Sequence, residues 1–112
     1  MEGLKMRNYS QDYMTEASRE LAIYAINDIS VYQGRARGIC HNLAKHMKRG
    51  DYDRERAVKG MVYATEFAAK RYVAEFAPGV PWHKMFTVQD RDGAAREMLE
   101  HYQSYIEELA NA

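Results

Sequence analysis

The stretch GDYDRERAVKGMVYATEFAAKRYVAEFAPG, residues 50–79, decides the fold of this 112-residue chain. Apolar side chains recur in it every three or four positions, the spacing that places them on one face of an α-helix. This inward row consists of Ala57, Val58, Met61, Ala64, Thr65, Ala68, Tyr72 and Phe76. Asp51 or Asp53 can cap the start of the helix, and Pro78 with Gly79 ends it. The stretch therefore predicts a long amphipathic helix with a turn at each end.

The same spacing continues on both sides of this stretch. Before it, apolar residues between positions 14 and 32 share one helix face. After it, Thr87 and Asp90 form the pattern of a capping box, which marks the start of another helix. The apolar row that follows contains Val88, Ala95, Met98, Leu99, Tyr102, Ile106 and Leu109. The pattern predicts an all-α, single-domain protein, a compact bundle of about four amphipathic helices.

Composition indicates an ordinary folded, soluble protein. Hydrophobic residues make up 46% of the chain, charged residues make up 29%, and 16 Lys/Arg balance 16 Asp/Glu. A net charge of zero creates no overall field toward nucleic acid or an anionic membrane. No segment approaches the roughly 18 apolar residues of a membrane span, and residues 1–12, without a signal-like apolar run, are expected to form a flexible extension. The lone Cys40 cannot form an internal disulfide, which favours a cytoplasmic location.

Positive charge is concentrated in GRARGICHNLAKHMKRGDYD, residues 34–53. At about 100° per residue, four side chains of this segment fall within an arc of roughly 80°, opposite an apolar arc. With two flanking arginines they form the basic face, defined as Arg35, Arg37, His41, Lys45, Lys48 and Arg49. Gly50 is suited to end the helix, whereas its start is open: Ser30 can cap a new helix, or the preceding helix runs through.

Two interpretations of the basic face remain open. Residues 78–112 carry six acids and three bases, so charge is segregated along a neutral chain. The basic face can bind a partner, either a protein or a nucleic acid. Alternatively, it can pair with the protein's own acidic C-terminal helix, in the same chain or in a homodimer.

The segment PWHKMF, residues 81–86, places three large apolar side chains in a predicted loop. Exposure of all three would be unfavourable, so one interpretation is a hydrophobic plug at the end of the bundle. The other is that Trp82 is an exposed anchor for a partner protein, since tryptophan is enriched in interface cores. We therefore count Trp82 with the basic face among the candidate partner-binding residues.

Catalytic and metal-binding patterns are weak. No two of the four histidines are spaced i,i+4, and Cys40 falls on the apolar arc of its helix. The sequence thus predicts no cofactor, no metal site and no enzymatic activity. A small enzyme that uses His83 or His101 with a carboxylate is the weakest alternative.

RGDYDRERAVKGMVYATEFAAKRYVAEF, residues 49–76, followed by WHKMF, residues 82–86, resembles small helical accessory proteins of bacteriophages and other mobile elements. The positions that carry the resemblance are Gly50, Tyr52, Asp53, Ala57, Lys59, Ala69, Lys70, Tyr72, Glu75 and Phe76. The resemblance implies a non-enzymatic protein that binds a host protein or complex, such as an inhibitor of a host defence system. The alternative is a nucleic-acid-binding protein that uses the basic face.

Overall fold

The computed structural model describes residues 14–112, and this part of the chain is helical and contains no strand. Four helices form the body: α2 (Glu16–Asn27), α4 (Arg37–Arg49), α5 (Arg54–Phe76) and α7 (Val88–Ala110). Two short helices, α3 (Ile29–Val31) and α6 (Trp82–Met85), lie between them. The predicted all-α bundle is confirmed, whereas the expected flexible extension, residues 1–12, lies outside the described residues.

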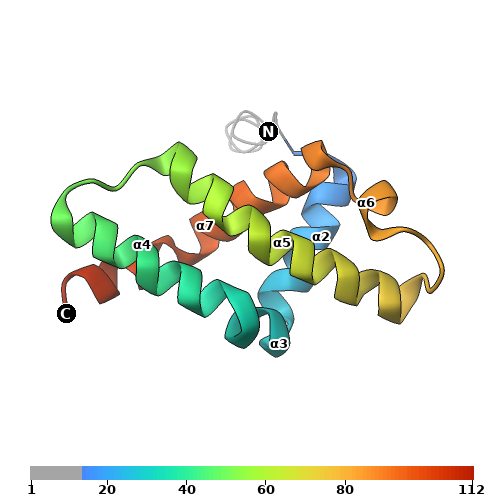
Figure 1. Ribbon diagram of the computed structural model, residues 1–112, viewed down its shortest axis with the longest axis horizontal. Helices are drawn as coiled ribbons and strands as arrows, with labels where there is room; N and C mark the ends of the chain where they lie inside the picture. The colour runs from blue at the N-terminus through green and yellow to red at the C-terminus, as the bar shows by residue number, and fades with distance from the viewer. Residues whose placement is uncertain (1–13) are drawn as a thin grey trace, which may run out of the picture.

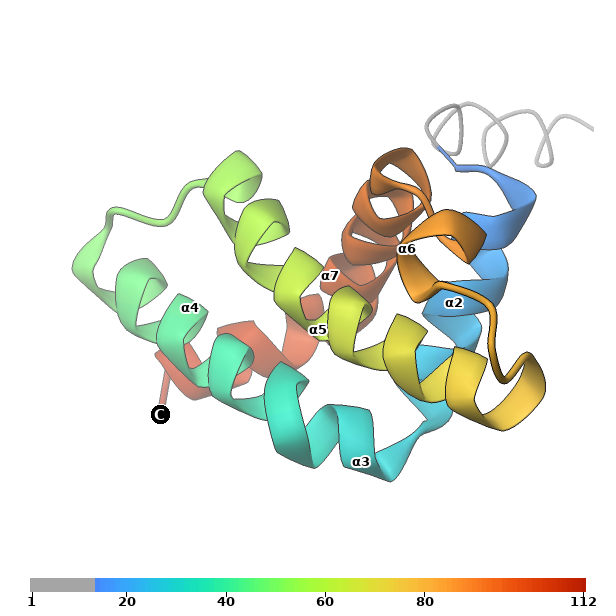
Figure 2. The ribbon, with the colours of Figure 1, turned by 45° about the vertical axis from the view of Figure 1, so that its right-hand side comes forward.

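Helix α7 is the element around which the others are arranged. Its N-terminal half packs against α2, α5 crosses it, and α4 lies along its C-terminal half (Figures 1 and 2). Its buried side chains therefore point to several sides: Asp90, Arg91, Ala94, Ala95, Met98, Leu99, Tyr102, Ile106 and Ala110. A helix that contacts three neighbours keeps only its outermost strip in solvent.

Small residues allow this close packing. Gly93, Ala94 and Ala95 are buried where α7 meets its neighbours, and α2 and α5 contribute further buried alanines. Larger side chains with almost no exposure then fill the centre, namely Leu21, Met61, Met98, Leu99, Ile106 and Phe86. Alternating small and large side chains is how helices interdigitate at protein packing density.

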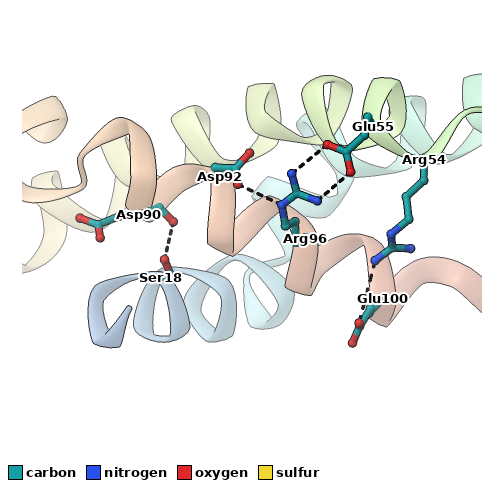
Figure 3. Close-up of polar contacts among 7 residues, drawn as sticks. All are labelled: Ser18, Arg54, Glu55, Asp90, Asp92, Arg96 and Glu100. Carbon is teal, nitrogen blue, oxygen red and sulfur yellow. Dashed lines mark hydrogen bonds and ion pairs between the residues drawn. The ribbon is translucent and has the colours of Figure 1, made fainter. Parts of the chain in front are cut away.

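Asp90 joins the first turns of α2 and α7. Its backbone amide donates to the Thr87 hydroxyl at 3.2 Å, and the Thr87 amide donates to its carboxylate at 2.9 Å, which confirms the predicted capping box. The hydroxyl of Thr15, the N-cap of α2, donates to the same carboxylate at 2.6 Å. The Ser18 hydroxyl donates to the Asp90 carbonyl oxygen at 2.8 Å (Figure 3). One residue thus fixes how two helices begin.

Arg96 joins α7 to α5. Its guanidinium donates to both carboxylate oxygens of Glu55, at 3.0 and 2.9 Å, and to Asp92 at 3.0 Å (Figure 3). Arg54 of α5 lies 3.9 Å from Glu100 of α7. Acidic side chains of α7 are therefore engaged by arginines of α5 and of α7 itself.

Turn chemistry sets the ends of α4 and α5. Asp53 caps α5 by accepting the Arg56 amide at 2.9 Å, and Gly50 ends α4 in the left-handed conformation, with φ at 81°. The chain does break after α2, but Asp28, not Ser30, is the cap of the next helix. The Asp28 carboxylate accepts hydrogen bonds from the backbone amides of Ser30 and Val31, at 2.8 and 3.0 Å, as short acidic side chains commonly do. A π-helical turn, Tyr32–Ala36, then leads directly into α4.

The predicted inward row of α5 is wrong at its end. Phe76 is 59% exposed, whereas Ala69 and Val73, which the row omitted, are buried. The last turn of α5 extends beyond the body of the bundle, so its inward face has little to pack against (Figure 1). Tyr24 and Tyr72 are the aromatic rings that lie beside Phe76.

We predict that Leu99→Asp unfolds the protein. Leu99 is fully buried on α7, and burying an unpaired charge there costs more than about 4 kcal/mol. Val88→Asp is the control on the same helix, because Val88 is 74% exposed and lies at the helix N-terminus. Thermal denaturation followed by circular dichroism checks both variants. A cooperative transition at the parent temperature in Leu99→Asp would contradict the assigned core.

A second prediction concerns Asp90 and pH. Burial alone would raise the pKa of this carboxyl, but hydrogen bonds from Thr15 and Thr87 outweigh it and hold the pKa below the ordinary value of 3.8. Asp90→Ala should cost about 2 kcal/mol at neutral pH, since a cap and an interhelical bond are lost. A lowered pKa stabilises the fold above the unfolded-state value and ceases to do so as the pH falls through the folded value. Urea unfolding at neutral pH and below pH 4 should therefore show the difference between variant and parent shrinking in acid.

Candidate binding surface on helix α4

The structure exposes all six residues of the basic face, but Arg35 lies over the Phe67 ring of α5, whereas His41 lies beside Tyr105 of α7. The buried side of α4, formed by Cys40, Leu43 and Ala44, packs inward, which leaves the basic side chains in solvent. All six are exposed, with Arg35 on the π-helical turn and the others along α4. Trp82 is not part of this surface, because α6 lies on the other side of α5 from α4 (Figures 1 and 2).

Most cations of the basic face have no carboxylate partner. Of the six residues of the basic face, only Arg49 forms an ion pair with an acid among residues 14–112; it lies 3.8 Å from Asp51, which also lies 3.1 Å from His46. The Arg35 guanidinium lies 4.8 Å from the centroid of the Phe67 ring, and Lys48 donates to the Ala112 carbonyl oxygen at 3.4 Å.

Among the described residues, the basic face forms no ion pair with an acid of the C-terminal helix. His41 approaches α7 through Tyr105, whose hydroxyl oxygen lies 3.2 Å from its Nε2. The α7 acids Asp92 and Glu100 pair instead with Arg96 and Arg54. The expected pairing with the acidic helix of the same chain is thus not seen among the described residues, and pairing in a homodimer stays a prediction.

A small depression lies beside the basic face, between α4 and α7. It measures about 200 Å³ and is lined by His41, Ala44, Lys45, Lys48 and Leu109. Three basic side chains thus surround a small apolar floor. Such a depression suits an acidic or uncharged polar group whose carbon atoms contact Leu109.

A larger groove of about 500 Å³ separates α4 from α5. The two helices run antiparallel, and the π-helical turn before α4 approaches α5 where Gly34 faces the Phe67 ring. Toward their connecting turn they diverge (Figure 1). The apolar lining consists of Ile39, Leu43, Tyr52 and Tyr63. The rest of the wall is formed by Gly38 and Gly60 and by the polar residues Asn42, His46, Asp51, Asp53 and Arg56.

Sequence reasoning missed this groove, although one signal was present. Gly38 and Gly60 each interrupt a helical pattern, and an interior helix glycine usually has a packing or functional reason. Packing inside the chain does not require them: a Cβ at Gly38 would meet nothing within 4 Å, and one at Gly60 only the edge of Ile39 at 4.0 Å. Both glycines keep the groove open.

Trp82 packs within its own chain. It is half-buried, with the Arg91 guanidinium 4.9 Å and the Lys70 ammonium 5.2 Å from its ring centroid. Phe86, 2% exposed, is the fully buried plug of this segment, while Met85 is 37% exposed. The plug interpretation therefore holds for Phe86, whose ring centroid lies 5.1 Å from that of Tyr72.

Other candidate groups lie apart from one another. His83 and His101 are exposed on different helices, and residues 14–112 contain no cluster of three His, Cys, Asp or Glu side chains able to hold a metal. Burial raises the pKa of the Cys40 thiol to about 12, so at neutral pH it is a protonated, packed side chain. No helix in the described range is long and apolar enough to cross a membrane.

Comparison with known proteins identifies no relative: no family model, curated protein or solved structure matches the chain. The side chains and their geometry are therefore the basis for assigning a function.

We predict that Gly38→Ala and Gly60→Ala each stabilise the protein by about 0.5–1 kcal/mol. Alanine is the better helix former, and the structure leaves room for its methyl group at both positions. Gly50→Ala is the control: with φ at 81°, it should be destabilising by about 1 kcal/mol. Chemical denaturation measures all three, and destabilisation by Gly38→Ala would mean that α4 and α5 lie closer together than described.

Proposed function

We propose that this protein is a non-enzymatic binding protein that uses the basic face of α4 to dock onto an acidic surface of a partner protein. The observation that carries the proposal is that Arg37, Lys45 and Lys48 lie along one helix and form no ion pair with an Asp or Glu side chain among residues 14–112. Unpaired like charges on one surface repel each other, and a complementary partner surface removes that repulsion.

The groove between α4 and α5 supports a protein as the partner. Ile39 and Tyr63 line it, and Tyr63 is 66% exposed. Apolar side chains beside a charged rim are the arrangement that protein interfaces use, with aromatic side chains at their centre. An amphipathic helix that carries acids along one edge would contact the groove and the basic face together.

The resemblance to phage accessory proteins supplies the setting. A protein of that kind would bind a host protein or complex in the host cytoplasm, and inhibition of a defence system would follow from covering the partner's working surface. Such an activity requires no cofactor and no bond-breaking step.

Nucleic-acid binding is the second candidate, favoured by the regular spacing of the basic face. Arg37, His41 and Lys45 follow one another at four-residue intervals, so they form a straight row on α4. A row of this kind can follow a phosphate backbone. Against it, the chain carries no net positive charge.

We predict that the triple variant Arg37→Glu, Lys45→Glu, Lys48→Glu folds normally and loses its partner. All three side chains are exposed, so helical content and melting temperature should change little. Affinity capture from host lysate, with and without nuclease treatment, should recover a specific protein with the parent and not with the variant. The control triple variant Lys59→Glu, Lys70→Glu, Lys84→Glu makes the same change of charge on other exposed positions and should retain the partner.

Three results would change the assignment. Capture that disappears on nuclease treatment, with a logarithmic salt slope of about −3 to −5, would favour nucleic acid. Loss of self-association in the variant, measured by sedimentation, would mean that the basic face meets the acidic α7 of a second copy. Equal capture by the parent and both triple variants would contradict the proposed surface.

A further inference from the structure

A third hollow, unrelated to the basic face, lies between α2 and α5. It measures about 540 Å³ and is lined by the rings of Tyr24, Tyr72 and Phe76 together with the side chains of Glu20 and Glu75. The rings come from two helices: Tyr24 extends from α2, and the other two from the end of α5. Aromatic and acidic side chains therefore meet at one place on the surface.

The three rings are mutually inclined. The centroids of Tyr24 and Tyr72 are 5.3 Å apart at 80°, and those of Tyr72 and Phe76 are 4.9 Å apart at 54°. Tyr24 and Phe76 are 6.1 Å apart, also at 80°. Phe76 is 59% exposed, so its ring is accessible from solvent. The face of an aromatic ring is its negative pole, and a cation placed over it is attracted.

The carboxylates add formal negative charge to this aromatic wall. The Tyr24 hydroxyl donates to Glu75 at 3.2 Å, and the Tyr72 hydroxyl donates to Glu20. Neither carboxylate forms an ion pair or a further hydrogen bond within residues 14–112. The third acid at the hollow, Asp28, is neutralised by Arg71 at 3.3 Å.

The tyrosines themselves contribute no charge. Burial and the hydrogen bond to Glu75 raise the pKa of Tyr24 to about 12, and the hydrogen bond to Glu20, with burial, raises the pKa of Tyr72. At physiological pH the phenols are therefore neutral donors. Two glutamates give the hollow a formal charge of −2 that no described cation balances.

We propose that this hollow binds an alkylammonium group, held by the rings of Phe76, Tyr24 and Tyr72 and by the carboxylates of Glu20 and Glu75. An anion would be repelled, and a neutral apolar ligand would leave both carboxylates unpaired beside it. An alkylammonium group suits both the aromatic rings and the carboxylates, because its carbon atoms contact the rings while its charge faces the acids. This site lies on α2 and α5 and does not depend on the function proposed for α4.

The test is titration of the full chain with choline, followed by NMR of the backbone amides. Amides of Ile23, Tyr24, Glu75 and Phe76 should shift, with a dissociation constant of about 1–10 mM for such an exposed site. The matched neutral ligand is the alcohol in which a carbon atom replaces the nitrogen of choline, and it should bind at least about tenfold more weakly. A parallel titration with Nα-acetyl-lysine methylamide tells whether a lysine side chain or a free quaternary amine is the better source of the cation.

Two variants distinguish binding at this site from non-specific binding of choline to exposed rings and acids elsewhere on the protein. Phe76→Leu keeps an apolar side chain and removes a ring, and Glu75→Gln removes a charge while its amide oxygen still accepts from Tyr24. Each should weaken choline binding about three- to tenfold. The controls are Tyr63→Leu, which removes an exposed ring elsewhere on α5, and Glu108→Gln, which removes an exposed acid of α7.

Both controls should bind choline within twofold of the parent, and all four variants should melt near the parent temperature, because each change is at an exposed side chain. Equal affinity for choline and its neutral counterpart would overturn the proposal. Shifts that map away from α2 and the end of α5, or unchanged binding in both site variants, would overturn it as well.

Discussion

The packing of α7 against three helices at once is the constraint on which the rest of the structure depends. Small side chains at Gly93, Ala94 and Ala95 let neighbours approach, and Leu99 lies fully buried between them. Although α4 lies along α7, no acid of α7 forms an ion pair with the basic face among residues 14–112, and Asp92 and Glu100 pair with Arg96 and Arg54 instead. The outward surface of α4 is left basic, and we infer that a partner protein covers it.

Local chemistry explains how much of the fold was predictable. The Thr87 capping box, the glycine end of α4 and the helical rows depend on residues a few positions apart, so the sequence displays them directly. The hydrogen bond between Thr15 and Asp90 links positions 75 residues apart, so no periodic pattern in the sequence indicates it. Asp28 was missed as a cap because several short polar side chains near it meet the same local rule.

The candidate site, too, was predictable in part: features set by local spacing were visible in the sequence, and features set by helix packing were not. The row of cations along α4 follows from helical spacing alone, and in the structure each of these side chains is exposed. Whether an acid faced them depended on which side of α7 lies against α4, and the periodicity of one helix does not encode that. The hollow between α2 and α5 was missed for a related reason: Phe76 has core spacing, but α5 extends past its neighbours at that point. Exposure at a helix end is set by the lengths and crossing of the helices.

Native-state hydrogen exchange tests the central position of α7 most directly. If α7 holds the bundle together, the amides of residues 94–106 should exchange only through global unfolding and should be the slowest in the protein. Amides of α4 that face solvent should exchange faster, through smaller openings. The account would be contradicted if α7 exchanged through local opening while α2, α4 and α5 remained protected, because those helices would then be held together without it.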